Sequence, residues 1–292
     1  MNDPVAIHRR LETVYQMYIE SALPLRYRSL SKERSALLKK PGVITQAPLI
    51  EPIPVYASSG LTLAQAAERL PDAYRDLAVL AGSLFPDGRE LYAHQWEALR
   101  SALSGTDVVV TTGTGSGKTE SFLLPLLAAL AADSRSWAPM GPAPADRRWW
   151  RAGTKRVPQW SHSRRPHAVR ALILYPLNAL VEDQMRRLRS ILDDPGVCRW
   201  LDEERRGNRI TFGRYTSLTP LAGPETPNRV KRLAAQLQDL EAQERAVTEA
   251  LAGREDGSRF HFPSLDSGEV WSRWDAQDAP PDILITNYSM LN

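Results

Sequence analysis

The sequence contains one cysteine, Cys198, among its 292 residues. A single thiol excludes an internal disulfide framework and a cysteine-built metal site, so the composition favours a reducing compartment. No apolar run reaches the roughly 18 residues that a membrane-spanning helix needs. The first residues, Met1-Asn2-Asp3-Pro4, lack the basic-then-apolar pattern of a secretion signal. We therefore expect a cytoplasmic protein with no membrane partner.

The sequence also has little excess of charge. It carries 37 Lys and Arg residues against 34 Asp and Glu residues, for a net charge of +3 and a pI near 9.0. This balance is by itself a weak argument for nucleic-acid binding. The hydrophobic fraction of 42% is enough for a substantial core, and the length predicts one or two domains.

The most informative stretch is a glycine-rich loop between a predicted strand and a predicted helix. The three β-branched residues Val108 to Val110 predict a short buried strand, and the apolar run from Phe122 to Leu130 predicts a helix. The order strand, glycine-rich loop, helix is the context of a phosphate-binding P-loop. The loop residues are Thr112, Gly113, Thr114, Gly115, Ser116, Gly117, Lys118, Thr119 and Glu120.

The residue types of this loop suit a nucleoside triphosphate. Gly113, Gly115 and Gly117 permit positive φ angles, so backbone N–H groups can turn inward around phosphate oxygens. A helix that begins near Lys118 adds free N–H donors and the positive end of its dipole. Lys118 is predicted to reach the β- and γ-phosphates, and the Thr119 hydroxyl to bind Mg²⁺. The cofactors predicted are therefore ATP and Mg²⁺; the alternative is a ligand-free turn.

A helix predicted to begin within Leu91 to Leu99 leads directly to this loop. Gln95 lies in it, and its amide can present both a donor and an acceptor to the edge of an adenine ring. The alternative is an ordinary solvated helix start. The position of Gln95, shortly before the loop, favours the adenine contact.

The first third of the chain has no recognisable chemistry. Apolar residues recur at spacings of three and four over residues 4 to 22, which predicts an amphipathic helix. Shorter helices are predicted over residues 33–40, 61–70 and 71–81, with an extended Pro-rich stretch at 43–60. We interpret residues 1–84 as a helical extension and residues 85–292 as the nucleotide-binding domain.

The segment from Ser134 to Arg170 is rich in tryptophan and basic residues. It holds Trp137, Trp149, Trp150 and Trp160, and the basic residues Arg135, Arg147, Arg148, Arg151, Lys155, Arg156, Arg164, Arg165 and Arg170, against one acid, Asp146. Basic side chains interleaved with aromatic rings suit a nucleic-acid backbone and unstacked bases. An equally good interpretation is a loop whose tryptophans anchor it and whose arginines are solvated. We expect an insertion over residues 134–168 without regular structure.

The remainder of the chain alternates strands with helices. Strands are predicted over residues 170–175, 209–216 and 282–288, and a long helix over residues 228–252. This order predicts a parallel α/β sheet with ligands at the carboxyl ends of its strands. Polar residues lie at those ends: Thr112, Thr216, Thr286 and Asn287.

Taken together, these motifs resemble the first RecA-like domain of superfamily 2 helicases of DEAD/DEAH-box type, most closely the large bacterial helicases of phage-defence islands. The resemblance covers roughly residues 85–292. It implies an α/β RecA-like fold, ATP and Mg²⁺ at Lys118 and Thr119, and adenine at Gln95. It also implies contacts to single-stranded DNA phosphates from Pro176, Asn178, Arg214, Thr216, Thr286 and Asn287.

A helicase motor also needs a carboxylate pair at the end of a hydrophobic strand, to hold Mg²⁺ and position water. Asp282 begins its predicted strand, Asp202 to Glu204 follow no strand, and Glu120 lies in the first turn of a helix. None of them fits that role. We therefore expect the N-terminal part of an ATP-dependent DNA helicase or translocase that does not hydrolyse ATP efficiently alone. The alternatives are a non-catalytic ATP- and DNA-binding subunit completed by a partner chain, and a decayed gene fragment.

Overall fold

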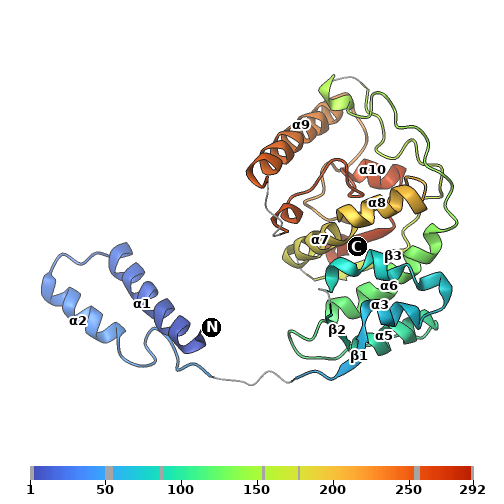
Figure 1. The fold of residues 1–292 in the computed structure, drawn as a ribbon. Helices are drawn as coiled ribbons and strands as arrows, with labels where there is room; N and C mark the ends of the chain where they lie inside the picture. The colour runs from blue at the N-terminus through green and yellow to red at the C-terminus, as the bar shows by residue number, and fades with distance from the viewer. Residues whose placement is uncertain are drawn as a thin grey trace. The chain divides into compact units, whose positions relative to one another are not determined.

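The computed structural model describes residues 3–49, 55–85, 88–152, 155–176, 178–252 and 257–290, with the side chains of Asn178 and Ala179 left out. The chain forms two compact units, Met1–Val55 and Tyr56–Asn292 (Figure 1). Among the described helices, none is long and apolar enough to cross a membrane.

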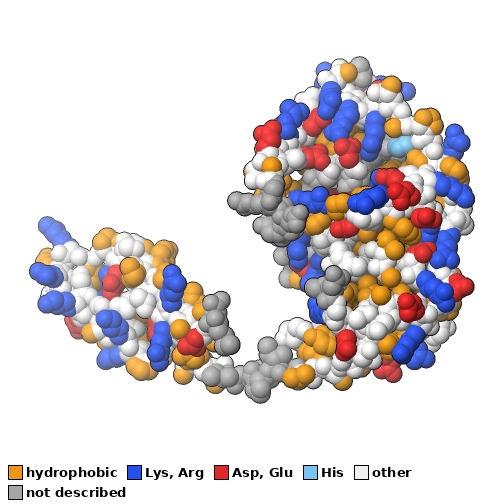
Figure 2. All heavy atoms as spheres, viewed as in Figure 1, with side chains coloured by type: hydrophobic (Ala, Val, Ile, Leu, Met, Phe, Trp, Pro, Cys, Tyr) orange, Lys and Arg blue, Asp and Glu red, His pale blue; other side chains and the backbone are white. Residues whose placement is uncertain are grey.

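The first unit is a pair of helices. Helix α1 (Pro4–Ala22) confirms the predicted amphipathic helix: the Asp3 side chain caps it by accepting from the Val5 N–H, and Pro4 occupies the first turn. Helix α2 (Arg28–Leu38) starts earlier than predicted, and Ser35 on it receives a hydrogen bond of 3.0 Å from Gln16 on α1. Neither helix has a fully buried residue. Figure 2 shows hydrophobic side chains on the surface of this unit.

The second unit begins with a short antiparallel pair and small helices. Strand β1 (Ser58–Thr62) pairs with β2 (Glu90–Tyr92), and α3 (Leu63–Glu68), η1 (Asp72–Tyr74), α4 (Leu77–Leu80) and η2 (Gly82–Leu84) lie between them in sequence. Helix α5 (Ala93–Leu103) packs against α6 (Lys118–Ser134). Residues 56–84 therefore pack with the larger unit, whereas the sequence placed the boundary after residue 84.

The parallel sheet predicted from the sequence is present. Strands β3 (Ala171–Tyr175), β4 (Phe212–Tyr215) and β5 (Ile283–Asn287) lie in the order β3-β5-β4 and run parallel. Helices α7 (Asn178–Leu192) and α8 (Pro195–Glu204) follow β3, and α10 (Arg273–Asp278) precedes β5. Ile283 and Ile285 are fully buried on β5, as expected for a central parallel strand. The α/β class is confirmed.

The strand predicted over Val108 to Val110 is wrong. These residues are not in a strand, and the side chains of Val108 and Val109 are 39% and 87% exposed. A strand requires a neighbour for its backbone N–H and C=O groups. In the described part of the chain, the sheet of β3, β5 and β4 leaves this segment unpaired. Thr112 accordingly does not lie at the end of a strand.

The tryptophans of the Trp-rich segment anchor this loop to the rest of the domain, as the second interpretation predicted. Its four tryptophans are at most 6% exposed. Trp149 and Trp150, in the turn η3 (Trp149–Arg151), pack against Leu233 and Leu237 of the long helix α9 (Pro227–Ala250) in a second hydrophobic core. Because these rings are buried, they are not available to stack on nucleic-acid bases. The loop thus contributes to the second hydrophobic core of the domain.

The basic residues of this segment are largely paired with acids. Glu241 on α9 accepts from the Trp150 indole at 3.0 Å, from Arg148 at 2.9 Å and from Arg151, and the bonds from Arg151 lower its pKa to about 2. Figure 2 shows acidic side chains beside basic ones at this end of the unit. The α9 helix is consequently fixed to the loop along one face.

A buried ionic cluster ties together the starts of the three parallel strands. Asp282, fully buried, precedes β5 and accepts two hydrogen bonds from Arg165 at 2.6 and 2.8 Å and one from Arg170 at 2.7 Å. It also accepts from the Thr211 N–H and hydroxyl, just before β4. The Arg165 guanidinium lies 3.8 Å from the centre of the Trp137 ring. This cluster lies at the end of the sheet opposite to the predicted binding edge.

Candidate functional site

The glycine-rich loop ends where helix α6 begins, at Lys118. Gly117, the N-cap residue, has a φ of 72°, and Gly115 has a φ of 76°, both in the left-handed region that glycine tolerates best. Gly113 does not take a positive φ; the hydroxyl of Tyr56 lies only 2.7 Å from where its Cβ would be. No described side chain caps α6, so its first N–H groups are available to an anion.

Gln95 holds the loop rather than pointing away from it. It is fully buried, its Oε1 accepts from the Tyr92 N–H at 2.9 Å, and its Nε2 donates to the Gly117 carbonyl at 3.1 Å. A Cβ at residue 117 would lie 2.2 Å from this Nε2. The structure therefore brings Gln95 to the loop predicted from the sequence, and both ends of its amide are engaged by the backbone.

Further polar contacts fix the interior of the loop. The Thr112 and Ser116 hydroxyls are 2.6 Å apart, and the Lys118 ammonium donates to the Thr112 carbonyl at 2.8 Å. The Lys118 side chain is exposed. Thr119 lies in the first turn of α6, and Thr114 lies in the turn that precedes it. The hydrogen bond from Lys118 thus joins the two ends of the loop.

Glu120 joins this loop to the helix after β3. Its carboxylate accepts from Arg187 of α7 at 3.0 Å, and the charge of Asp183 together with Glu120 raises the pKa of Arg187 against the opposing effect of burial. This ion pair joins the first turn of α6 to α7. In the residues that the structure describes, no group of three His, Cys, Asp or Glu side chains is positioned to hold a metal ion.

The sequence reasoning missed an aromatic cluster beside the loop. The rings of Tyr92 and His94 stack with centroids 5.6 Å apart, and Tyr56 lies 5.5 Å from Tyr92. His94 Nε2 is 2.8 Å from the Ser116 carbonyl, and the Tyr56 hydroxyl donates to the Thr114 carbonyl at 3.4 Å. Tyr92 and His94 adjoin Gln95 and were visible in the sequence, whereas nothing local places Tyr56 here.

The second predicted site lies at the carboxyl ends of the parallel strands. Tyr175 pairs with Asn287 and Tyr215 with Thr286, so the strands end at a common edge. Pro176 follows β3 and is exposed. Asn178 begins α7, and its side chain lies outside the described residues.

The polar side chains at this edge are mostly used internally. Thr286 is buried and donates to the Tyr215 carbonyl at 2.6 Å, and Asn287 accepts from the Ser289 hydroxyl at 2.7 Å. The buried Thr216 hydroxyl accepts from the Leu218 N–H at 3.2 Å. Arg214 forms an ion pair with Glu182 of α7. These contacts shape the loops after the strands, and the predicted roles of the residues in DNA binding stay predictions.

Replacing Gln95 by alanine is expected to lower the free energy of unfolding by about 2 kcal/mol, because a buried side chain is truncated, the Tyr92 N–H loses its acceptor and the Gly117 carbonyl loses one of its donors. Hydrogen exchange at the amides of residues 113–118 should speed up markedly. The matched control is Gln65→Ala, since Gln65 forms the same capping box with Thr62 in an exposed position away from the loop. An equal acceleration of exchange in both variants would contradict the role given to Gln95.

Comparisons with known proteins agree with these motifs. Residues 92–220 match the family model described as DEAD/DEAH box helicase. Druantia protein DruE of Escherichia coli (strain UMEA 4076-1) is 30% identical over an alignment of 318 positions, which covers 94% of this chain and 16% of that protein. The uncharacterized ATP-dependent helicase YprA of Bacillus subtilis (strain 168) is 30% identical over 108 positions, covering 37% of this chain and 10% of that protein.

Among solved structures, the DUF1998 helicase MrfA bound to DNA is 21% identical, with a TM-score of 0.37, and the match covers 76% of this chain and 18% of that chain. The chain thus spans less than a fifth of the length of each of these proteins.

Proposed function

We propose that this chain, whose residues 92–220 match the DEAD/DEAH box helicase family, binds ATP with Mg²⁺ at the glycine-rich loop and single-stranded DNA at the carboxyl ends of β3, β4 and β5. The observation that carries the proposal is the start of α6. A helix of 17 residues begins there behind two left-handed glycines, without a side-chain cap among the described residues.

Each part of the loop has a different role in holding the triphosphate. The free N–H groups at the start of α6 bind phosphate oxygens, and Lys118 exchanges the Thr112 carbonyl for the phosphates. The Thr119 hydroxyl would be a ligand for Mg²⁺, and the ion would neutralise phosphate charge. Gln95 fixes the loop backbone through the Gly117 carbonyl. Nucleotide binding therefore relies on backbone geometry that is set before the ligand arrives.

The aromatic cluster supports the base of the nucleotide. Tyr56, Tyr92 and His94 give a rigid set of rings directly beside the loop. Aromatic faces are favourable surfaces for a planar nucleobase. The Gln95 amide keeps one N–H and one lone pair beyond its two hydrogen bonds, but the side chain is fully buried, so a direct contact to adenine requires the surrounding loop to open.

The DNA contacts are proposed to be mainly phosphate contacts. The hydroxyls of Thr216 and Thr286 are engaged within the protein, so they position loops whose exposed residues meet the strand. Contacts of this kind orient a nucleic acid without reading its sequence, and they weaken as salt concentration rises. The stable loops at the sheet edge therefore define a path for the sugar–phosphate backbone.

Replacing Lys118 by alanine is expected to weaken binding of a fluorescent ATP analogue in the presence of Mg²⁺ by at least about tenfold, because a charged contact to the phosphates is lost. The control is Lys32→Ala, an exposed lysine of α2 in the other compact unit. Unchanged affinity in the Lys118 variant, with its thermal midpoint preserved, would refute the nucleotide site.

The same samples test the expectation that this chain alone turns ATP over slowly. Glu120, the acid beside the loop, forms an ion pair with Arg187 and is therefore not free to position water. Phosphate release should stay near background with and without single-stranded DNA, and DNA-stimulated release that disappears in Lys118→Ala would show that the chain is a complete motor.

A further inference from the structure

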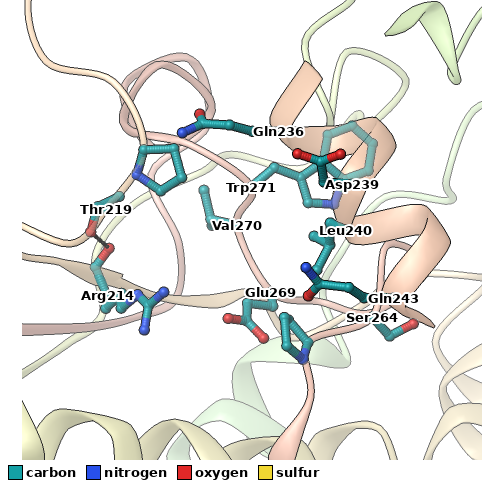
Figure 3. A pocket seen from close by; sticks show the side chains of 12 residues that line it. Arg214, Thr219, Gln236, Asp239, Leu240, Gln243, Ser264, Glu269, Val270 and Trp271 are labelled. Carbon is teal, nitrogen blue, oxygen red and sulfur yellow. Dashed lines mark hydrogen bonds between the residues drawn. The ribbon is translucent and has the colours of Figure 1, made fainter. Parts of the chain in front are cut away.

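A cavity of about 320 Å³ lies next to the end of β4, between the loop that follows Arg214 and the helix α9 (Figure 3). Its polar lining comes from Arg214, Gln236, Asp239, Gln243 and Glu269, and Trp271 and Leu240 form apolar walls. Its volume is at the lower end of the range for pockets that hold small ligands, roughly 300–1,000 Å³. The cavity is thus large enough for one small ligand group.

Helix α9 presents three polar side chains to this cavity. Gln236, Asp239 and Gln243 are spaced by three and four residues, so they share one face of the helix. All three are exposed, and among the described residues none has a hydrogen-bond or ion-pair partner. Figure 3 shows them on the same side of the cavity, across from Arg214. Because Glu241 on the neighbouring face holds α9 to the loop, the helix backbone fixes the positions from which these side chains extend.

The opposite walls are rigid. Glu269 is engaged in two hydrogen bonds from Arg189, at 2.6 and 2.8 Å. Trp271 is 7% exposed and meets Trp150 edge to face with centroids 5.0 Å apart. In the described part of the chain, the buried indole N–H of Trp271 has no partner.

The chemistry of the lining selects the ligand class. Arg214 and the loop after β4 lie on the path proposed for the DNA backbone, so a base turned out of that strand meets the cavity. Amide side chains both donate and accept, whereas the Asp239 carboxylate only accepts. A carboxylate pairs with the exocyclic amino group of a base, as an acid does with N4 of cytosine. Thymine has no such amino group.

We infer that this cavity receives one unstacked nucleobase of a bound single DNA strand, and that Asp239 favours bases that carry an exocyclic amino group. The inference rests on the proposed binding of single-stranded DNA at the strand ends. It adds a base-sensing element to an interface that otherwise contacts phosphates. Gln236 and Gln243 hold the remaining edge of the base.

The test compares the affinities of the full chain for short fluorescent oligo(dC) and oligo(dT), measured by anisotropy at the same salt concentration. The wild type is expected to bind oligo(dC) about fivefold more tightly, and Asp239→Ala to reduce this ratio to about one, because one charge-assisted hydrogen bond is lost. Gln243→Leu keeps the side-chain size and should also reduce the ratio.

The charge-matched control is Glu249→Ala, on an exposed position of the same helix and away from the cavity lining. It removes one negative charge, so it strengthens binding of both oligonucleotides alike and leaves the ratio unchanged. Equal affinity of the wild type for the two oligonucleotides, or a ratio that survives in both cavity variants, would overturn the inference. Failure of the wild type to bind either oligonucleotide would instead overturn the proposed DNA binding.

Discussion

Asp282→Asn is expected to lower the free energy of unfolding by about 3–5 kcal/mol, the cost of removing one partner of a buried ion pair. The Arg165 side chain is 1% exposed and that of Asp282 is fully buried, so the guanidinium left behind has no access to water. The variant also weakens the hydrogen bonds from Thr211 that precede β4. Denaturation by urea, followed by tryptophan fluorescence, measures the loss.

The control for this experiment is Asp72→Asn. Asp72 forms an ion pair with Arg75 on the surface, where the two side chains are 83% and 56% exposed. Such a pair contributes little, between about 0 and 1 kcal/mol. If Asp282→Asn cost no more than this control, the cluster at the starts of the strands would not stabilise the sheet.

Stability is also expected to depend on pH through Asp193, which follows α7. Burial, and next the nearby carboxylate of Glu269, raise the pKa of Asp193 from 3.8 to about 7, against the opposing charges of Arg189 and Arg259. The folded protein therefore holds a proton that the unfolded chain releases between about pH 4 and pH 7. The free energy of unfolding should fall over this range as pH rises, by on the order of 3 kcal/mol.

Asp193→Asn should remove this slope and make the protein more stable than the wild type at pH 8. The comparison is a set of urea unfolding curves at several pH values. Asp146→Asn, at an exposed position, should leave the slope of the wild type intact. A wild type whose stability rises from pH 4 to pH 7 would show that Asp193 is not the group that controls it.

Local patterns in the sequence were sufficient for much of the fold. Helix α1 and helix α9 begin and end within a few residues of the predicted bounds, because their apolar spacing is regular and a proline marks each start. The three apolar runs of the parallel sheet were likewise recognisable as strands. The glycines before Lys118 and the apolar run beyond it predicted the loop and helix α6, and the binding of ATP there stays a prediction.

Features that depend on distant partners were not predictable. Val108 to Val110 have the composition of a strand, but a strand forms only where a neighbour supplies hydrogen bonds. Composition alone also did not distinguish a nucleic-acid surface from an anchored loop, because Trp150 needs α9 to be buried. Asp282 looked unremarkable at the start of a strand, and its importance comes from Arg165, far away in the sequence.

At the candidate site too, features set by local sequence were predictable and contacts between distant residues were not. The positive φ angles of Gly115 and Gly117 followed from the motif, whereas the close approach of Tyr56 to Gly113 requires the pairing of β1 with β2. Gln95 lies at the loop, and its predicted contact with adenine stays a prediction. The use of its amide by backbone groups depends on the three-dimensional arrangement of α5 and α6.

The strand order has a kinetic consequence. Strand β5 lies between β3 and β4. Ala171 at the start of β3 pairs with Ile283 at the start of β5, so a long stretch of sequence separates the two paired strands. Neither flanking strand can find its parallel neighbour until the last part of the described chain is available. Because closing long loops must precede the gain from pairing, folding of this sheet should be slow. During synthesis on the ribosome, β3 and β4 are made before β5 and stay unpaired until it emerges. Their apolar side chains are exposed in that interval, and we expect chaperones to bind them.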